Sequence, residues 1–309
     1  MPASVRPRRS ALYIPGSNER AMAKAATMPA DVIILDLEDS VPPAQKDAAR
    51  DAVATTVLKL LGGRREIVVR INDLDSPWAP RDIAVIAAAG PNAILLPKVQ
   101  RTDDIRRARA AFAAARATKT QSLWVMIETP AAVLNVAAIA AIAALPTPPI
   151  TAFVIGANDL AADLGLPPRP GRPALLPHIA QTQLAARAHG LAVLDGTFND
   201  IDDRQGLQFE CRQGRDLGLD GKTVIHPTQI AVANEAFAPD REELFWARKV
   251  VEAFAEPENA EAEVIRLSGR MVERLHERAA RRTIAVADAI TLIDQEFRDK
   301  PKQLRRPKT

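Results

Sequence analysis

Short runs rich in valine, isoleucine and leucine recur along the chain and are separated by longer segments of helical composition. Most of these runs are continuously apolar, which is the pattern of strands buried on both faces in a parallel sheet. The predicted strands are Ser10–Gly16, Asp31–Asp39, Arg65–Asn72, Ala93–Val99, Ser122–Thr129, Thr151–Asp159, Ala192–Phe198 and Lys222–His226. The predicted helices between them are Ala44–Leu61, Thr102–Ala117, Pro130–Leu145, Pro173–His189 and Asp200–Leu217.

This alternation of strand and helix favours an α/β fold of the (β/α)₈ TIM-barrel type. A doubly wound sheet is the alternative, but no glycine-rich phosphate loop follows the first strand. Thr102, which precedes two acids, and Thr129, which precedes a proline, are expected to begin helices. Five prolines between Pro167 and Pro177 predict an ordered loop inserted after the sixth strand.

The chain of 309 residues is predicted to contain three segments. Residues 1–239 form the barrel, and residues 299–309 form a basic tail that is expected to be disordered. Between them, residues 240–298 form a helical lid or oligomerisation segment, with helices at Arg241–Phe254 and Gly269–Arg298. A barrel does not need this segment to close, so it either packs beneath the barrel or reaches over an active site, which can be that of a neighbouring subunit.

Composition excludes several classes of protein. Hydrophobic residues make up 47% of the chain and charged residues 26%, which is the balance of a protein with a sizeable core. The most apolar stretch, Ala131–Leu145, is shorter than the roughly 20 residues of a membrane span, so no membrane association is expected. A single cysteine, Cys211, fits a reducing, cytoplasmic location.

The net charge of +3 is concentrated at the two ends of the chain. Residues 1–9 carry +3 and residues 298–309 carry +5, so the remainder carries −5. A nucleic-acid-binding domain would show a basic face with interleaved aromatics, whereas only 12 aromatic residues occur here. We therefore expect no nucleic-acid partner.

Polar side chains follow the predicted strands at their C-terminal ends, where the active sites of barrels lie. These ends carry Tyr13-Ile-Pro-Gly16, Glu38-Asp39, Arg70-Ile-Asn72, Lys98, Glu128, Asn158-Asp159, Asp195 and His226. Each acid by itself could cap a helix or form a loop salt bridge. Because seven of the eight ends carry an ionisable side chain, the set as a whole indicates a site.

Glu128 and Asp159 end neighbouring strands, so their carboxylates can converge. Two carboxylates leave several positions for water and substrate oxygens, which is how Mg²⁺ is usually held. No convergent histidine and cysteine set points to zinc. Two separate salt bridges are the alternative interpretation.

Three other strand-end residues have two interpretations each. Arg70 could hold a substrate carboxylate bidentately or pair with a nearby acid, Glu38 or Asp39. Lys98 could form a Schiff base, as in a metal-free aldolase, although a structural or phosphate-facing role is favoured. His226 could donate a hydrogen bond to a substrate or order its loop.

The sequence resembles the HpcH/HpaI aldolase and citrate lyase β-subunit superfamily, in particular its CoA-ester lyase branch. The matching segments run in order from residue 9 to about residue 275. They are Arg9–Gly16, Asp31–Val41, Val69–Asn72, Leu96–Val99, Ile127–Thr129, Gly156–Gly165, Asp195–Gly196, Phe198–Asp200 and Gly221–Gln229.

The resemblance implies a TIM barrel that binds Mg²⁺, with Mn²⁺ as a possible substitute, through Glu128 and Asp159. It implies that Arg70 contacts the oxo acid and the developing enolate. Tyr13 and Lys24 fall where relatives contact CoA, and Ile225 and His226 lie near the substrate. The implied reaction is reversible carbon–carbon cleavage of a 3-hydroxyacyl-CoA thioester, such as malyl-, citramalyl- or citryl-CoA, into an acyl-CoA and a 2-oxo acid.

The chain departs from the family pattern at two positions. Asn158 stands where relatives carry Glu or Ala, a change that is not expected to disturb the metal carboxylate. Glu273 stands where CoA-ester lyases carry an aspartate that reaches into a neighbouring subunit's site, so a homo-oligomer, a trimer or hexamer, is expected. A shift near 1 Å in a positioned base can cost about 10²-fold in rate, so Glu273 is either adapted to another substrate or a degraded remnant.

Three alternative functions remain open at this stage. The chain could be a citrate lyase β subunit acting on a carrier-protein thioester, or a free-acid aldolase of the metal-dependent class. A non-catalytic thioester-binding protein is the third.

Overall fold

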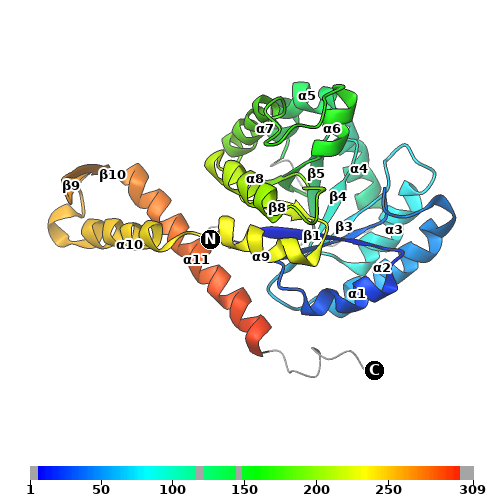
Figure 1. Cartoon of the computed structure of the whole chain (residues 1–309), viewed down its shortest axis with the longest axis horizontal. Coiled ribbons are helices and arrows are strands. Elements are labelled where there is room, and N and C mark those ends of the chain that lie inside the picture. Colours follow the sequence, from blue (N-terminus) through cyan, green and yellow to red (C-terminus); the bar gives the residue numbers. More distant parts are fainter. Residues whose placement is uncertain (1–5, 116–120, 144–147, 300–309) are drawn as a thin grey trace. The chain divides into compact units, whose positions relative to one another are not determined.

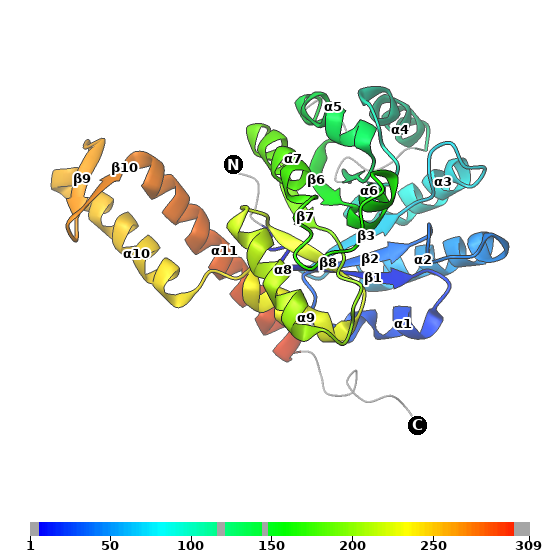
Figure 2. The ribbon, with the colours of Figure 1, turned by 45° about the horizontal axis from the view of Figure 1, so that its top comes forward.

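Eight parallel strands close into a barrel in this computed structural model, which describes residues 6–115, 121–143 and 148–299. Each strand pairs with the next one in sequence, and the last pairs with the first through Ser10 and Lys222. The strands are β1 (Ser10–Pro15), β2 (Val32–Asp36), β3 (Glu66–Arg70), β4 (Ala93–Leu96), β5 (Ser122–Ile127), β6 (Ile150–Ile155), β7 (Ala192–Asp195) and β8 (Gly221–Val224). The predicted (β/α)₈ barrel is confirmed (Figures 1 and 2).

Helices follow every strand of the barrel. They are α1 (Glu19–Lys24), α2 (Lys46–Leu60), α3 (Ala79–Ala89), α4 (Thr102–Ala114), α5 (Pro130–Ala141), α6 (Ala157–Asp163), α7 (Leu176–Ala188), α8 (Arg204–Asp216) and α9 (Pro227–Ala236). Four of these (α1, α3, α6 and α9) lie outside the predicted helical segments. The residues predicted to end two helices, 116–117 and 144–145, lie outside the described residues.

Both predicted helix starts are confirmed, since α4 begins at Thr102 and α5 directly follows Thr129, but their capping groups differ. Thr129 caps α5 as expected, since its hydroxyl accepts the N–H of Ala132. The Thr102 hydroxyl does not cap α4. Instead, the Asp104 carboxylate accepts the N–H groups of Gln100 and Arg101, because an acid at the third helical position can reach back to this backbone.

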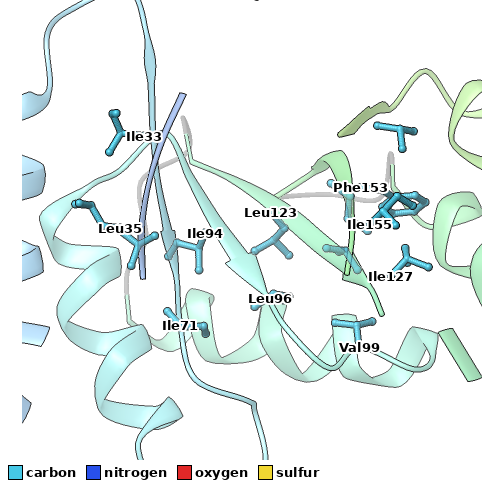
Figure 3. Packing of buried hydrophobic residues seen from close by; sticks show 14 of the residues in the cluster. Ile33, Leu35, Ile71, Ile94, Leu96, Val99, Leu123, Ile127, Phe153 and Ile155 are labelled. Carbon is cyan, nitrogen blue, oxygen red and sulfur yellow. The ribbon is translucent and has the colours of Figure 1, made fainter. Parts of the chain in front are cut away.

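Alternate residues of each strand face two different apolar layers. In β2, Ile33 and Leu35 pack in the layer between strands and helices, part of which Figure 3 shows. Val32 and Ile34 belong to the barrel interior, together with Ala11, Val68, Ala93, Leu95, Trp124, Met126, Ala152, Val154 and Leu194. Because both layers exclude water, the strands are apolar on both faces, which explains their continuous runs in the sequence.

A buried ion cluster holds the proline-rich loop against the outer face of the barrel. Arg172, from this loop, donates to both carboxylate oxygens of Asp195 at 2.6 and 2.7 Å. The Lys222 ammonium lies 2.9 Å from Asp195 and 3.2 Å from Glu210 of α8. Asp195 lies two positions after Val193 in β7, so both side chains point to the outer face of the barrel. This strand-end acid therefore supports the fold and does not face the barrel mouth.

We expect Asp195→Ala to lower the free energy of unfolding by about 3–5 kcal/mol, because it leaves two buried cations opposite Glu210 alone. Denaturation in urea, followed by circular dichroism, measures this loss. Asp216→Ala, at an exposed end of α8, is the matched control and should change the free energy by no more than about 0.5 kcal/mol. A similar small effect for Asp195→Ala would show that the cluster contributes little.

Residues 238–299 belong to a second compact unit, whereas Arg8–Phe237 form the barrel unit. The second unit contains α10 (Arg241–Ala255), the antiparallel hairpin of β9 (Val264–Leu267) and β10 (Arg270–Glu273), and α11 (Arg274–Asp299). Its core includes Val250, Phe254 and Val272.

The helix predicted from Gly269 therefore begins five residues later, at Arg274, and that boundary was wrong. Ser268 (φ +49°) and Gly269 (φ +79°) connect β9 to β10 in the left-handed region. A two-residue hairpin turn with both central residues at positive φ matches the twist of the strands. The predicted basic tail lies almost entirely outside the described residues. Within those residues, no helix has the length and apolar character needed to cross a membrane.

Candidate active site

The interior-facing positions of the strands become polar where the strands end. In β3, the interior residue Val68 is followed two positions later by Arg70. Asp36 at the end of β2 and Glu128 just beyond β5 likewise lie two positions after an interior residue. Tyr13 packs against the same interior cluster. Because all eight strands are parallel, these side chains gather at one mouth of the barrel.

A pocket of about 410 Å³ opens at this mouth. It is bounded by side chains at the ends of the strands and in the segments that follow them. The lining residues are Tyr13, Pro15, Asp36, Asp39, Ser40, Arg70, Met126, Ile155, Gly156, Ala157, Asn158, Asp159, Thr197, Asn199, Thr223 and Ile225. The pocket therefore joins apolar walls to a small number of charged and amide groups, as small-molecule sites do.

Arg70 lies at the centre of an ion cluster in this pocket. Its guanidinium donates to both oxygens of Asp36, at 2.6 and 2.7 Å, and lies 2.8 Å from Glu38 and 3.3 Å from Asp39. It also stacks over the ring of Tyr13 at 4.9 Å. The predicted pairing with Glu38 and Asp39 is thus present, and Arg70 lines the pocket as well.

Burial and charge act in opposite directions on the acids of this cluster. Burial raises the pKa of Glu38 to about 8, although Arg70 opposes the shift. Burial also works against the charge of Asp36, but the charge and hydrogen bonds of Arg70 prevail and lower its pKa. Asp36 is therefore a permanent anion that fixes Arg70, whereas Glu38 can hold a proton near neutral pH.

Glu128 and Asp159 meet through Lys98. The backbone N–H of Lys98 donates to Glu128 Oε1 at 2.6 Å. The Lys98 ammonium lies 2.5 Å from Asp159 Oδ1 and 3.8 Å from Glu128 Oε2. Asp159 stands in the first turn of α6, because β6 ends at Ile155 and not at Asp159 as predicted. The two acids thus share one cation and do not form two separate salt bridges.

The donor set of this carboxylate pair fits a divalent cation. Glu128 is fully buried, and its Oε2 has no hydrogen-bond partner. Burial raises the pKa of Glu128 to about 7, so a stronger positive charge is needed to keep it ionised. Only two carboxylates converge here, since the described part of the chain contains no group of three or more His, Cys, Asp or Glu suited to a metal. Mg²⁺ is commonly bound through one or two carboxylates and completed by water or substrate oxygens.

Gly156 makes room for Glu128. A Cβ atom at Gly156 would lie 2.2 Å from the Cβ of Glu128 and 2.7 Å from its Oε2. Only a glycine fits between β6 and this side chain, so a substitution at Gly156 would displace the carboxylate.

Asn158 and Ile225 both line the pocket. Asn158 forms a reciprocal amide pair with Asn199, with N–O distances of 2.9 and 3.1 Å. The amide side chain, which departs from the family pattern, therefore links α6 to the segment after β7. Asn158 leaves the adjacent Asp159 paired with Lys98.

Three predicted site residues lie elsewhere. Lys24 is exposed in the last turn of α1 and does not line the pocket. The His226 ring caps α9 through Thr228, at 2.8 Å from its hydroxyl, which is its predicted loop-ordering role. Glu273 ends β10 in the second unit, and its backbone N–H donates to the His276 ring. A CoA contact for Lys24, a place near the substrate for His226 and a role for Glu273 remain predictions.

Sequence reasoning missed Asp36, Thr197, Asn199 and Thr223, all of which line the pocket. A signal for Asp36 was available, since it follows the interior residue Ile34 by two positions. Thr197 and Asn199 lie on an irregular segment after β7, where no periodicity indicates the direction of a side chain.

The family model for HpcH/HpaI aldolase/citrate lyase matches residues 9–227. A (3S)-malyl-CoA thioesterase of Cereibacter sphaeroides is 44% identical over 284 residues, covering 92% of this chain and 96% of the relative. An L-malyl-CoA/beta-methylmalyl-CoA lyase of the same species is 35% identical over 272 residues, covering 80% and 84%.

Among solved structures, protein CitE of Mycobacterium tuberculosis in complex with magnesium, acetoacetate and coenzyme A is 32% identical to this chain. The two align with a TM-score of 0.72 over 92% of this chain and 100% of the other. The family resemblance of the motifs is therefore confirmed over the barrel and beyond it. On both sequence and structure, the chain belongs to the HpcH/HpaI aldolase/citrate lyase family of enzymes.

Proposed function

We propose that the chain is a Mg²⁺-dependent CoA-ester lyase that cleaves a carbon–carbon bond of a malyl-CoA-like 3-hydroxyacyl thioester. The products would be an acyl-CoA and a 2-oxo acid. The observation that carries the proposal is the pairing of Glu128 and Asp159 in the barrel mouth beside Arg70. The malyl-CoA lyase relative and the CitE complex with magnesium and coenzyme A support it.

Glu128 and Asp159 would hold the cation, with Mn²⁺ as a substitute. When bound, Mg²⁺ would supply the positive charge that polarises the hydroxyl and carboxylate oxygens of the substrate. The pocket needs this charge, because Asp36, Asp39 and Asp159 offset Arg70 and Lys98 and would repel an anionic substrate.

Arg70 would stabilise the oxygen on which negative charge develops as the carbon–carbon bond breaks. Asp36 holds the guanidinium on one edge by two hydrogen bonds, so its position is fixed before the substrate arrives. Tyr13 covers the face of Arg70 and excludes water from it. Tyr13 and Lys24 would contact the CoA portion, and Ile225 and His226 would lie near the substrate.

As the carbon–carbon bond breaks, the substrate hydroxyl would lose its proton to water and become the ketone oxygen, and Glu273 from a neighbouring protomer would act as the acid that protonates the acyl carbon. In the reverse direction, the same carboxylate would remove that proton. This role makes a homo-oligomer part of the proposal.

A second candidate is hydrolysis of the thioester, which would yield free CoA and a hydroxy acid. The relative named (3S)-malyl-CoA thioesterase, at 44% identity over 92% of this chain, favours it. Glu273 in place of aspartate also favours it, because a longer side chain could activate a water molecule at the thioester carbonyl. Both reactions would use the same cation and the same Arg70.

Product analysis separates the two reactions. We would incubate the protein with malyl-, citramalyl- and citryl-CoA in Mg²⁺ and in EDTA, and quantify acyl-CoA, oxo acid, hydroxy acid and free thiol by chromatography. Acyl-CoA and oxo acid in equal amounts support the lyase, and free CoA with hydroxy acid supports the thioesterase. Turnover of only a carrier-protein thioester or of free hydroxy acids would identify the citrate lyase β or aldolase alternative. No turnover with retained CoA binding would identify a non-catalytic binding protein.

Arg70→Lys should lower kcat/KM by about 10²-fold, because an ammonium cannot reproduce the bidentate contact with Asp36 and would shift by about 1 Å. Steady-state kinetics on the active thioester measures this loss. Arg204→Lys, at an exposed start of α8, is the matched control and should be unaffected. Wild-type kcat/KM in Arg70→Lys would remove Arg70 from the mechanism.

A further inference from the structure

The side chain of Lys98 lies between the two carboxylates of the proposed metal site. Its ammonium is 2.5 Å from Asp159 and 3.8 Å from the Glu128 oxygen that has no hydrogen-bond partner. A cation at this position neutralises a buried and a half-exposed carboxylate together. The ammonium thus offsets the negative charge of both carboxylates, as a divalent ion between the same oxygens would do.

The backbone of Lys98 is held in an unusual conformation. Its φ of +54° lies in the left-handed region, which costs a non-glycine residue roughly 1 kcal/mol. In this conformation its N–H donates to Glu128 Oε1 at 2.6 Å. The backbone therefore orients Glu128, whereas the side chain places a positive charge near both carboxylates, so these two roles can be separated by substitution.

Neither Lys98 nor Glu128 lines the pocket at the barrel mouth. Asp159 lines the 410 Å³ pocket, whereas Glu128 is absent from its lining and is 0% exposed. Because the ammonium lies close to an oxygen of each carboxylate, a cation that binds both of these oxygens has to displace it. Space for the displaced side chain is present, because Lys98 lines a separate cavity of about 80 Å³ whose lining includes Asp73, Asp75 and Asp104.

We infer that the Lys98 ammonium holds the place of the divalent cation between Glu128 and Asp159 in the metal-free protein and is displaced when the cation binds. This inference rests on the metal site of the proposed function. Two consequences follow. Lys98 lowers the affinity for the cation by competing for its ligands, and it stabilises the protein when no cation is present.

The test measures the affinity for Mn²⁺ alone, by electron paramagnetic resonance of the free ion, with Mg²⁺ as competitor. The informative variant is Lys98→Asn, because asparagine tolerates positive φ and so keeps the backbone donor to Glu128 while the charge is lost. Lys98→Arg keeps the charge, and Lys59→Asn removes an equal charge at an exposed position of α2. Asp159→Asn shows whether the measured site is the proposed one.

We expect Lys98→Asn to bind Mn²⁺ about tenfold more tightly than wild type, a change equivalent to about 1.4 kcal/mol. Lys98→Arg should bind no more tightly than wild type, and Lys59→Asn should match it. In EDTA, Lys98→Asn should melt roughly 2–4 °C below wild type, and Mg²⁺ should raise its melting temperature by more than it raises that of wild type.

The results distinguish failure of this inference from failure of the proposed site. If wild type binds Mn²⁺ and Asp159→Asn does not, but Lys98→Asn binds with equal or lower affinity than wild type, the displacement is overturned and the metal site stands. If wild type binds no Mn²⁺, or Asp159→Asn binds as wild type does, the proposed metal site fails and the role of Lys98 fails with it.

Discussion

Glu128→Gln and Asp159→Asn should each lower turnover by roughly 10³-fold or more, since a Lewis-acid cation contributes several kcal/mol of transition-state stabilisation. Each change removes one of two anionic ligands, so the affinity for Mg²⁺ should fall as well. The fold should persist. Burial already raises the pKa of Glu128 to about 7, so a neutral side chain of the same shape suits this site, and the amide oxygen can still accept the N–H of Lys98.

Turnover of the active thioester, Mg²⁺ titration calorimetry and circular dichroism measure these three properties in the same preparations. Glu235→Gln, at an exposed position of α9, is the matched control for loss of a carboxylate. Wild-type turnover in EDTA by either site variant would contradict the metal mechanism. Loss of turnover with unchanged Mg²⁺ affinity would place the cation elsewhere.

Glu273→Ala should lower kcat by about 10²–10⁴-fold, the range typical of a general acid or base. Glu273 is paired across the hairpin with Val264. Val272 and Ile265 occupy the opposite face and pack into the core of the second unit, whereas Val264 is 51% exposed. Glu273 is itself half-buried and lies on the hairpin face opposite this core, which is the face that we predict a neighbouring protomer receives.

Kinetics on the product-assigned substrate measures this effect, with Glu263→Ala, just before β9, as the control. Glu273→Asp then separates adaptation from decay. An adapted site should lose activity when the side chain is shortened, and a decayed site should gain it. Wild-type kcat in Glu273→Ala would exclude the residue from the proton transfer.

Mixed oligomers test the predicted action in trans. Inactive Glu273→Ala and inactive Asp159→Asn protomers should regain part of the activity after mixing, because some sites would combine an intact barrel with an intact Glu273. Mixed oligomers confirmed by mass spectrometry that show no recovery would limit the hairpin to packing.

The order of the barrel strands and most residues of the candidate site were predictable from the hydrophobic pattern of the chain. Strands buried on both faces must be apolar at successive positions, so their runs are visible without any knowledge of tertiary contacts. The convergence of Glu128 and Asp159 was predictable for a related reason, since neighbouring parallel strands end at the same edge.

Side-chain direction at the strand ends was decided by the tertiary structure. Asp195 and Glu128 both follow apolar strands in the sequence, yet Asp195 joins a buried ion cluster beneath α8 and Glu128 faces the mouth. Which side chains of a strand point inward and which point outward decides the location of each acid. A run that is apolar on both faces does not show which of its residues point inward. In the second unit, strands of only four residues gave too short a pattern to distinguish β10 from the start of α11.

The position of Lys98 between the two carboxylates was the feature of the site that the sequence indicated least. Its ammonium meets Asp159, which lies 61 positions away in the sequence, and its positive φ turns the chain just beyond β4. Local sequence determines which residues form strands and helices, through propensity and burial. Contacts between groups on different strands depend on barrel closure and on the backbone angles at the strand ends, so only the tertiary structure placed a lysine between the two carboxylates.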